Sequence, residues 1–527
     1  MLATITFLSC FLMSVVAARD PLTITIAQGT LIGTMLPSTI PSKPPGKAWL
    51  GIPFGQTNAS VRFQAAAFAP SWGPSPRNAS TFGPACPQQD VAGIYGPQNE
   101  DCLNLNIYAP QVQGDSLLPV MVWIYGGSFE HGGNALPLYN GVNLANDGNV
   151  IVVAVNYRIG ALGFGATTAI GDDAMTGNYG LLDQRLGLKW VQQNIGAFGG
   201  DAANVTIFGE SAGSMSICFH LVSPGSWPYF GRVIMESGSC LQGQKGPRQP
   251  PAPYSIEGAT KQMSNLLQAL HCKTLACLQA TSVSDLITAQ NSLDAAYSLG
   301  WSPVVDGTII PADPLTLAAS GRMAPDVTIM LGMNTNEGTM FSLPWNATDF
   351  DYRAILDVEF GTAVGAQIYA QYPTASYNNN ASYAFAAAAG DYFFWCPGLR
   401  LASLASGASR GVYVYHFDHV PSWEPVLPLK VAHTYEIPFV FGNPGDYFVR
   451  TFGSFTPEED VLSHEMGDFW TSFAKSGAPS SPRSNVAWPT YDEKRQMMMF
   501  SVPTIGVQTD YKAKHCAFWD NLTPIQH

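Results

Sequence analysis

The chain has 527 residues, of which 46% are hydrophobic and only 12% are charged. This composition supplies a large apolar core and argues against a disordered protein. Lys and Arg number 25 against 38 Asp and Glu, so the net charge is −13. Such an acidic balance argues against nucleic acids and anionic membrane surfaces as partners, because like charges repel. The length by itself does not fix the number of domains.

The amino-terminal segment predicts export from the cell. Residues 1–18 form an apolar run that ends in the small residues Ala17 and Ala18. The run is too short for a comfortable membrane span, and it ends as a cleaved secretory signal does. We therefore expect a signal peptide over 1–18, no stable membrane insertion, and a secreted, extracellular mature chain over 19–527.

Possible glycan sites and cysteines fit the same oxidising compartment. Six Asn-x-Ser/Thr sequons occur, at Asn58, Asn78, Asn204, Asn346, Asn380 and Asn521. Each is a possible glycan site, and we expect Asn204 to stay unmodified because it opens a predicted buried strand. Cys10 leaves with the signal peptide, and the other eight cysteines are compatible with disulfide bonds.

Short apolar runs alternate with Gly-bearing turns and helical patterns along the chain. Continuous β-branched runs of this kind are typical of strands buried on both faces of a parallel sheet. The predicted strands are 120–125, 150–155, 205–208, 233–235, 327–331 and 412–415. Apolar residues spaced by three and four predict an amphipathic helix over 178–198. The Pro/Gly-rich stretch 243–253 fits a domain linker, but we favour a surface loop inside one α/β domain.

A pentapeptide at the end of the third predicted strand carries the strongest chemical signal. Gly209-Glu210-Ser211-Ala212-Gly213 lies between that strand and a predicted helix. A Gly-x-Ser-x-Gly in this position predicts the nucleophile elbow of an α/β-hydrolase, whereas without the strand and helix it would fit an ordinary glycine-rich turn. Gly209 and Gly213 leave room for the sharp reversal. The amide of Ala212 opens the helix, so it can donate to an oxyanion with help from the helix dipole.

Longer segments around this pentapeptide resemble a known family. Residues 198–213 are similar to the serine signature of the type-B carboxylesterases, which include cholinesterases, carboxylesterases and large fungal lipases, and residues 100–108 resemble that family's second signature. The similarity extends from about residue 51 to residue 522. It implies an α/β-hydrolase fold with a large, mostly parallel central sheet flanked by helices. It also implies carboxylic ester hydrolysis without a metal or cofactor.

A serine nucleophile needs a histidine base to accept its proton. His433 is the expected base, because its segment is similar to the family's His-x-x-Glu-Ile/Leu pattern and lies late in the chain, where the fold places the base. His416 and His419 flank the end of a predicted strand and remain open as rivals to His433.

The base in turn needs a carboxylate to orient it. Glu337 follows the predicted strand 327–331. Members of the family often carry Asp-Glu-Gly here, whereas this chain has Asn336 before Glu337, so only Glu337 can be the acid of that loop. Asp326 precedes the same strand and is a poor candidate. The resulting chain order of serine, glutamate and histidine is that of an α/β-hydrolase.

The expected oxyanion hole lies in residues 125–129, directly after a predicted strand. The family has Gly-Gly-Gly at this point, and carried over by position its donors are the amides of Gly127, Ser128 and Ala212. Ser128 departs from the usual glycine; its amide can still donate, but its side chain would crowd the acyl pocket. Glu210, beside the nucleophile, resembles the acid that the family places behind its active site.

The resemblance also implies three disulfide bonds: Cys86 with Cys102, Cys272 with Cys277, and Cys396 with Cys516. Cys218 and Cys240 are then expected to be free thiols in the core. The loop between Cys86 and Cys102 is short and offers little apolar face. This favours an esterase acting on small or soluble esters over a lipase with a long lid.

Together these features predict a secreted serine esterase that forms an acyl-enzyme intermediate. A lipase or sterol esterase and a feruloyl esterase remain as alternatives, and we do not expect cholinesterase activity. The same family contains inactive adhesion proteins, but those typically lose a member of the triad, and this chain keeps all three. The expected partner is a small-molecule or lipid ester, and the oligomeric state stays open.

Overall fold

The computed structural model describes residues 21–90, 93–114, 116–170, 173–241, 255–294, 300–342, 344, 346–407, 409–423, 428–445 and 453–522. The expected signal peptide and the stretch 243–253 lie outside these residues. Within them, no helix is both long enough and apolar enough to span a bilayer.

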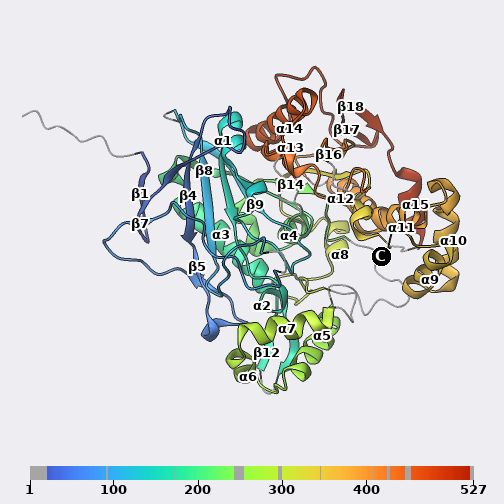
Figure 1. Cartoon of the computed structure of the whole chain (residues 1–527), viewed down its shortest axis with the longest axis horizontal. Coiled ribbons are helices and arrows are strands. Elements are labelled where there is room, and N and C mark those ends of the chain that lie inside the picture. Colours follow the sequence, from blue (N-terminus) through green and yellow to red (C-terminus); the bar gives the residue numbers. More distant parts are fainter. Residues whose placement is uncertain are drawn as a thin grey trace, which may run out of the picture.

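A sheet of eleven strands runs through the centre of the molecule (Figure 1). In spatial order its strands are β18 (Gly506–Thr509), β17 (Gln496–Phe500), β16 (Gly411–Phe417), β15 (Thr328–Asn334), β14 (Arg232–Glu236), β13 (Gly200–Glu210), β9 (Leu118–Ile124), β10 (Ile151–Val155), β8 (Asn104–Ala109), β4 (Gly46–Pro53) and β3 (Thr34–Leu36). The strands from β17 to β10 run parallel, and antiparallel strands extend both edges. All six predicted strands are present, which confirms the mostly parallel sheet.

The apolar runs become strands because both faces of the sheet are covered. Every residue of β10 and of β15 is buried. The register places Val122 of β9 between Val153 of β10 and Ile207 of β13, so β-branched side chains pack side by side. Helices that pack on the strands include α3 (Tyr179–Asn194), α4 (Ala212–Leu221), α12 (Cys396–Ala405) and α14 (Pro457–Ser476). The helix predicted over 178–198 is α3, continued by a 3-10 turn.

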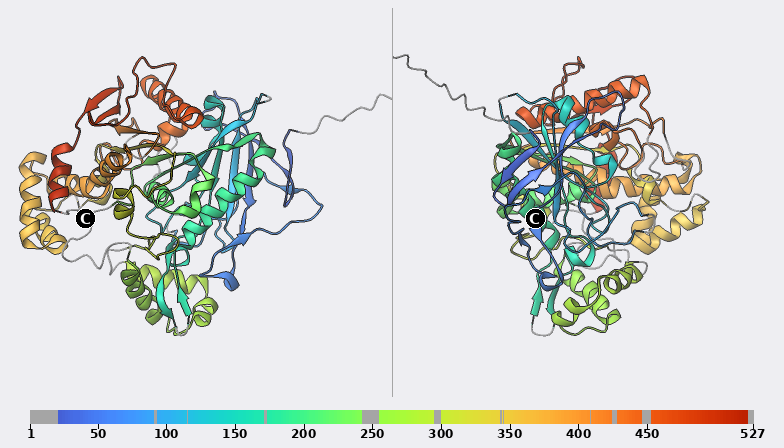
Figure 2. Two further views of the ribbon diagram at one scale, coloured as in Figure 1. Left: turned by 180° about the vertical axis from the view of Figure 1, so that it is seen from behind. Right: turned by 60° about the vertical axis from the view of Figure 1, so that its left-hand side comes forward.

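Two groups of helices lie outside the central sheet (Figures 1 and 2). The first group is α5 (Ile256–Ala269), α6 (Leu275–Ala280) and α7 (Val283–Asp294), with the small ribbon of β11 (Thr167–Ile170) and β12 (Asp173–Met175) against α5. The second is α9 (Asp349–Phe360), α10 (Thr362–Gln371), α11 (Ala381–Gly390) and α15 (Ala513–Leu522). The remaining helices are α1 (Val142–Gly148), α2 (Gly160–Phe164), α8 (Pro314–Ala319) and α13 (Ile437–Phe441), and the remaining strands are β1 (Thr23–Ile26), β2 (Gly29–Ile32), β5 (Gly55–Gln56), β6 (Ala67–Phe68) and β7 (Arg77–Asn78).

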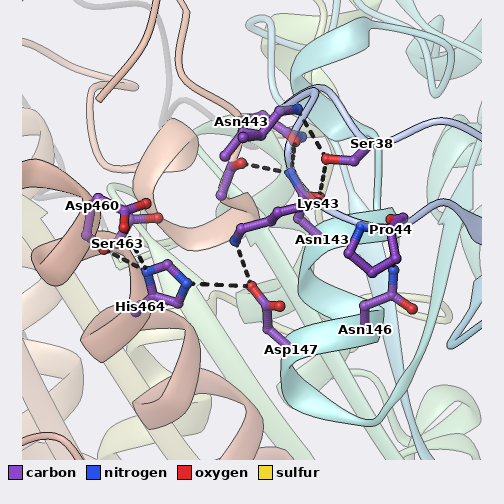
Figure 3. A network of polar contacts seen from close by, with 12 residues as sticks. Ser38, Lys43, Pro44, Asn143, Asn146, Asp147, Asn443, Asp460, Ser463 and His464 are labelled. Carbon is purple, nitrogen blue, oxygen red and sulfur yellow. Dashed lines mark hydrogen bonds and ion pairs between the residues drawn. The ribbon is translucent and has the colours of Figure 1, made fainter. Parts of the chain in front are cut away.

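A polar network fastens the start of the chain to its late segments (Figure 3). Ser38, ahead of β4, donates to Asn143 Oδ1 of α1 at 2.6 Å, and Asn143 Nδ2 donates to Asn443 Oδ1 at 3.1 Å. Lys43 and Asp147 form an ion pair at 2.7 Å beside it. Because Asn443 follows α13, the network joins segments about 400 residues apart. The single domain over 19–527 stays a prediction.

Four disulfide bonds cross-link the described part of the chain. They join Cys86 to Cys102, Cys218 to Cys240, Cys272 to Cys277 and Cys396 to Cys516. Three of them are the bonds that the family resemblance implies. The expectation that Cys218 and Cys240 are free thiols is wrong, because α4 packs on β14 and brings their Cα atoms to 5.5 Å.

Candidate active site

The candidate site lies where three neighbouring parallel strands end. Ser211 follows β13, Ser237 follows β14, and Glu337 lies three residues after the end of β15. Backbone hydrogen bonds hold these ends together: Ser211 N donates to Glu236 O at 2.9 Å, and Ser237 N donates to Gly332 O at 2.8 Å. The carboxyl ends of parallel strands are the usual ligand-binding edge of an open α/β sheet.

Ser211 occupies a sharp, strained turn between β13 and α4. Its backbone has φ 55° and ψ −121°, a conformation that costs a side-chain-bearing residue energy. The two flanking glycines allow the turn to press against β9, because a Cβ on Gly213 would lie 1.9 Å from the carbonyl oxygen of Ile124 and one on Gly209 would lie 2.3 Å from it. Ser211 itself is partly exposed, whereas its neighbours Glu210 and Ala212 are buried.

His433 and Glu337 meet beside this turn. His433 Nδ1 lies 2.6 Å from Glu337 Oε2, and both side chains are almost completely buried. The other carboxylate oxygen, Oε1, accepts from Asn334 N at 2.6 Å and from Ser237 Oγ at 2.6 Å. Three donors therefore fix the orientation of the Glu337 carboxylate. Asp326, in contrast, lies exposed ahead of β15 at 3.4 Å from an arginine.

The second imidazole nitrogen faces the nucleophile elbow. His433 Nε2 lies 3.0 Å from Oε1 of Glu210, the residue before Ser211. This is an ion-pair contact, and among the described residues neither atom has a hydrogen-bond partner. Nε2 therefore makes no hydrogen bond within the described residues that a serine hydroxyl or a leaving group would have to displace.

Burial and neighbouring charges together raise the pKa values of both His433 and Glu210. Burial lowers the pKa of His433, but the carboxylates of Glu210 and Glu337 raise it by more, so that it lies well above its ordinary value. Burial raises the pKa of Glu210, while the charge of His433 opposes this rise and that of Glu337 adds to it. His433 is consequently held as a strongly basic group between two acids.

The rival histidines take part in other networks. His416 Nε2 lies 2.7 Å from Thr335 Oγ1, and its Nδ1 lies 2.6 Å from Gln508 Nε2. His419 Nε2 lies 3.0 Å from Glu459 Oε1. Within the described part of the chain, neither His416 nor His419 has a hydrogen bond or ion pair with the acid that contacts His433.

The loop after β9 brings amide donors to the elbow. A Cβ on Gly126 would lie 2.9 Å from the Cβ of Ser211, so the loop passes directly beside the nucleophile. Gly127 has φ 111° and Ser128 has φ 57°, both in the region that favours glycine. Among the described residues, the amides of Gly127, Ser128 and Ala212 have no acceptor. This arrangement leaves three N–H groups for a bound anion or carbonyl oxygen.

Two aromatic rings cover the imidazole, and the sequence did not reveal them. Phe341, at the end of a 3-10 turn that begins at Glu337, has its ring 5.3 Å from that of His433. Phe394, on a π-helical turn (Asp391–Trp395), lies 4.7 Å from His433 and stacks on Phe341 at 5.7 Å. Phe341 could have been inferred because it lies four residues after Glu337, one helical turn away. Phe394 reaches the site only through tertiary packing.

Comparison with known proteins agrees with this geometry. The model of the carboxylesterase family matches residues 20–519, so the chain belongs to that family. The predicted family, α/β-hydrolase fold and class of carboxylic ester hydrolase are thereby confirmed. Among individual relatives, the cholinesterase of Mus musculus is 32% identical over 521 residues, which cover 90% of this chain and 83% of the relative. The absence of a metal or cofactor stays a prediction.

Proposed function

We propose that the protein hydrolyses carboxylic esters with Ser211 as nucleophile, His433 as general base and acid, and Glu337 as the group that orients His433. The observation that carries this proposal is the 2.6 Å contact between His433 Nδ1 and Glu337 Oε2 beside the strained turn of Ser211. A buried carboxylate at Nδ1 keeps the proton there and leaves Nε2 to accept the serine proton.

The reaction then proceeds in two balanced steps. The Ser211 hydroxyl oxygen bonds to the ester carbonyl carbon while its proton passes to His433 Nε2. The alcohol leaves with that proton, and an acyl-serine remains. A water molecule next gives a proton to His433 and attacks the acyl group, and the returned proton restores the Ser211 hydroxyl as the carboxylic acid departs.

The negative oxygen formed in each step would be held by the amides of Gly127, Ser128 and Ala212. Loss of one such donor typically lowers the rate by about 10²–10³-fold. Ser128 also adds a Cβ and a hydroxyl where the family usually has glycine. This extra volume would narrow the pocket that holds the acyl group of the substrate.

We propose small or moderately sized esters as substrates and the extracellular space as the site of action. Two observations support this proposal: the loop closed by Cys86 and Cys102 is short, and four disulfide bonds fit an oxidising compartment. The relative from mouse is named for the hydrolysis of choline esters, so a choline ester belongs in the test.

A panel of esters tests the substrate class. We expect kcat/KM to be highest for p-nitrophenyl acetate and butyrate and to fall by about tenfold or more for palmitate, ferulate and choline esters. Ser128→Gly is the matched variant, and it should raise the relative rate for bulkier acyl groups. The highest kcat/KM on palmitate would favour a lipase or sterol esterase, the highest on ferulate a feruloyl esterase, and the highest on the choline ester a cholinesterase.

The pH dependence of kcat/KM tests whether Glu210 and Glu337 raise the pKa of His433. Only unprotonated His433 accepts the serine proton, so kcat/KM should fall as the pH drops through the pKa of His433 in the free enzyme. We expect this acid limb above the ordinary value of about 6.5, because Glu210 and Glu337 raise that pKa. Glu210→Gln removes one of the two carboxylates, so its acid limb should move to lower pH. Glu458→Gln, an exposed change on α14, serves as the control; an unmoved limb in Glu210→Gln would contradict the assignment.

A further inference from the structure

Two more glutamates, Glu236 and Glu436, lie buried behind the proposed acid. Both are 0% exposed. Glu236 Oε1 accepts from Trp470 Nε1 at 2.7 Å, while its Oε2 has no hydrogen-bond partner among the described residues. Within the same residues, no lysine or arginine forms an ion pair with either glutamate. An ionised carboxylate in such a place is costly, because no positive charge replaces its lost water.

Asn334 shows which oxygen of Glu436 acts as an acceptor. Asn334 Nδ2 lies 2.7 Å from the carbonyl oxygen of Ala432 and 2.5 Å from Glu436 Oε2. A carbonyl can only accept, so the amide nitrogen of Asn334 must point to this side. Glu436 Oε2 is therefore an acceptor, and any proton on Glu436 belongs on Oε1.

Ser237 decides whether Oε1 carries that proton. Its hydroxyl oxygen lies 2.6 Å from Glu337 Oε1 and 3.1 Å from Glu436 Oε1. A serine hydroxyl has one proton to donate, so it cannot donate to both carboxylates at once. The shorter contact has the length of a hydrogen bond to a charged oxygen, which places the Ser237 proton on the Glu337 side. The 3.1 Å contact between Ser237 Oγ and Glu436 Oε1 is then a hydrogen bond only if Glu436 carries a proton and donates it to the serine oxygen.

We infer that Glu436 is a neutral carboxylic acid that donates to Ser237, and that Ser237 in turn donates its only proton to Glu337. Glu436 and Ser237 are thus positioning residues, which act on the reaction through Glu337 and His433. No proton has to move along this chain, since its effect is to fix the direction of each hydrogen bond. The inference rests on the roles proposed above for Glu337 and His433.

The surrounding charges support a neutral Glu436. Burial raises the pKa of Glu436 to about 8, and the carboxylates of Glu210 and Glu337 raise it too, against smaller opposing effects of Asn334 and His433. Glu236 faces the same cluster, and burial raises its pKa well above the ordinary range. The hydroxyl of Tyr415 also faces these acids, and burial raises its pKa, so it stays neutral.

Two substitutions at Glu436 separate a neutral donor from a buried charge. In Glu436→Gln the amide nitrogen can donate to Ser237 while the amide oxygen accepts from Asn334, which reproduces both contacts of the neutral acid. Glu436→Leu removes both, and we expect it to lower kcat by about 10- to 100-fold with little change in KM. Glu436→Gln should recover most of that loss at pH 7. It should also keep its rate above pH 8, where the wild-type rate declines as Glu436 loses its proton.

Infrared spectroscopy of the substrate-free enzyme gives an independent readout. At pH 7 the difference between wild type and Glu436→Gln should contain the carbonyl band of a protonated carboxylic acid, and Glu337→Gln should instead lose a carboxylate band. Loss of a carboxylate band in Glu436→Gln, or a kcat as low as that of Glu436→Leu, would overturn the inference. This readout needs no catalysis, so it stands even if Ser211 proves not to be the nucleophile, and it suffices if Glu436→Leu does not fold.

Discussion

Ser211→Ala should lower kcat/KM for a short-chain p-nitrophenyl ester by about 10⁴-fold or more. The variant keeps the amides of Gly127, Ser128 and Ala212, but it has no hydroxyl to form the acyl-enzyme. Water would have to attack the ester carbonyl directly, and only the oxyanion-hole amides and the position of the bound ester would assist that attack. Initial rates measure the loss, and a fluorophosphonate probe, which should bond covalently to the wild type, should leave the variant unlabelled.

A serine remote from the elbow provides the control. Ser264 is exposed on α5, and among the described residues its hydroxyl bonds only within its own helix, to Thr260 O at 2.7 Å. Ser264→Ala should therefore keep both the rate and the labelling. A Ser211→Ala variant that folds as the wild type does and retains a wild-type rate, or probe attached to a different residue, would refute the proposed nucleophile.

Glu337→Gln should lower kcat by about 10⁴-fold with little change in KM. The reason lies in the three donors around this side chain. The backbone N–H of Asn334 cannot turn away, so the amide oxygen of the glutamine has to take the place of Oε1. Its NH₂ group then faces His433 Nδ1, which must become an acceptor and move its proton to Nε2. That tautomer cannot accept the proton of Ser211.

The chain offers a matched control for this prediction in a second pair of glutamate and histidine, in which the glutamate is buried. Glu459 Oε2 accepts from Thr456 N at 2.9 Å in the capping box that starts α14, and Glu459 Oε1 lies 3.0 Å from His419 Nε2. Glu459→Gln should reduce the thermal stability through a weaker helix cap but change kcat by less than about tenfold. Nuclear magnetic resonance of the imidazole protons reports the tautomer directly. If Glu337→Gln kept its proton on Nδ1 and its rate, Glu337 would not orient the base.

Local patterns were enough to predict six strands of the sheet and the turn at Ser211, whereas the resemblance to the carboxylesterase family supplied Glu337, His433 and the oxyanion donors. The β-branched runs at 150–155 and 327–331 predicted strands because a strand buried on both faces must be apolar at every position. Gly209 and Gly213 predicted the turn at Ser211, because only glycine tolerates the close approach of β9. These features depend on neighbours in the chain, so a sequence displays them directly.

Local sequence patterns could not predict contacts between distant segments. The sequence did not predict the bond between Cys218 and Cys240, since only the packing of α4 on β14 brings the two together. Phe394 likewise contacts His433 from a π-helical turn, and no local sequence pattern predicted that turn. The expectation of free thiols was wrong for this reason.

The sequence by itself determined the class of enzyme, the order of the three proposed triad residues and the strands that carry the first two. It did so because the chemistry needs particular residue types at turns that adjoin apolar strands. Only the tertiary structure decided which of the buried acids carries a proton and which is ionised. Ser237, Glu337 and Glu436 come from three separate segments, and the direction of each hydrogen bond among them follows from distances that exist only after folding.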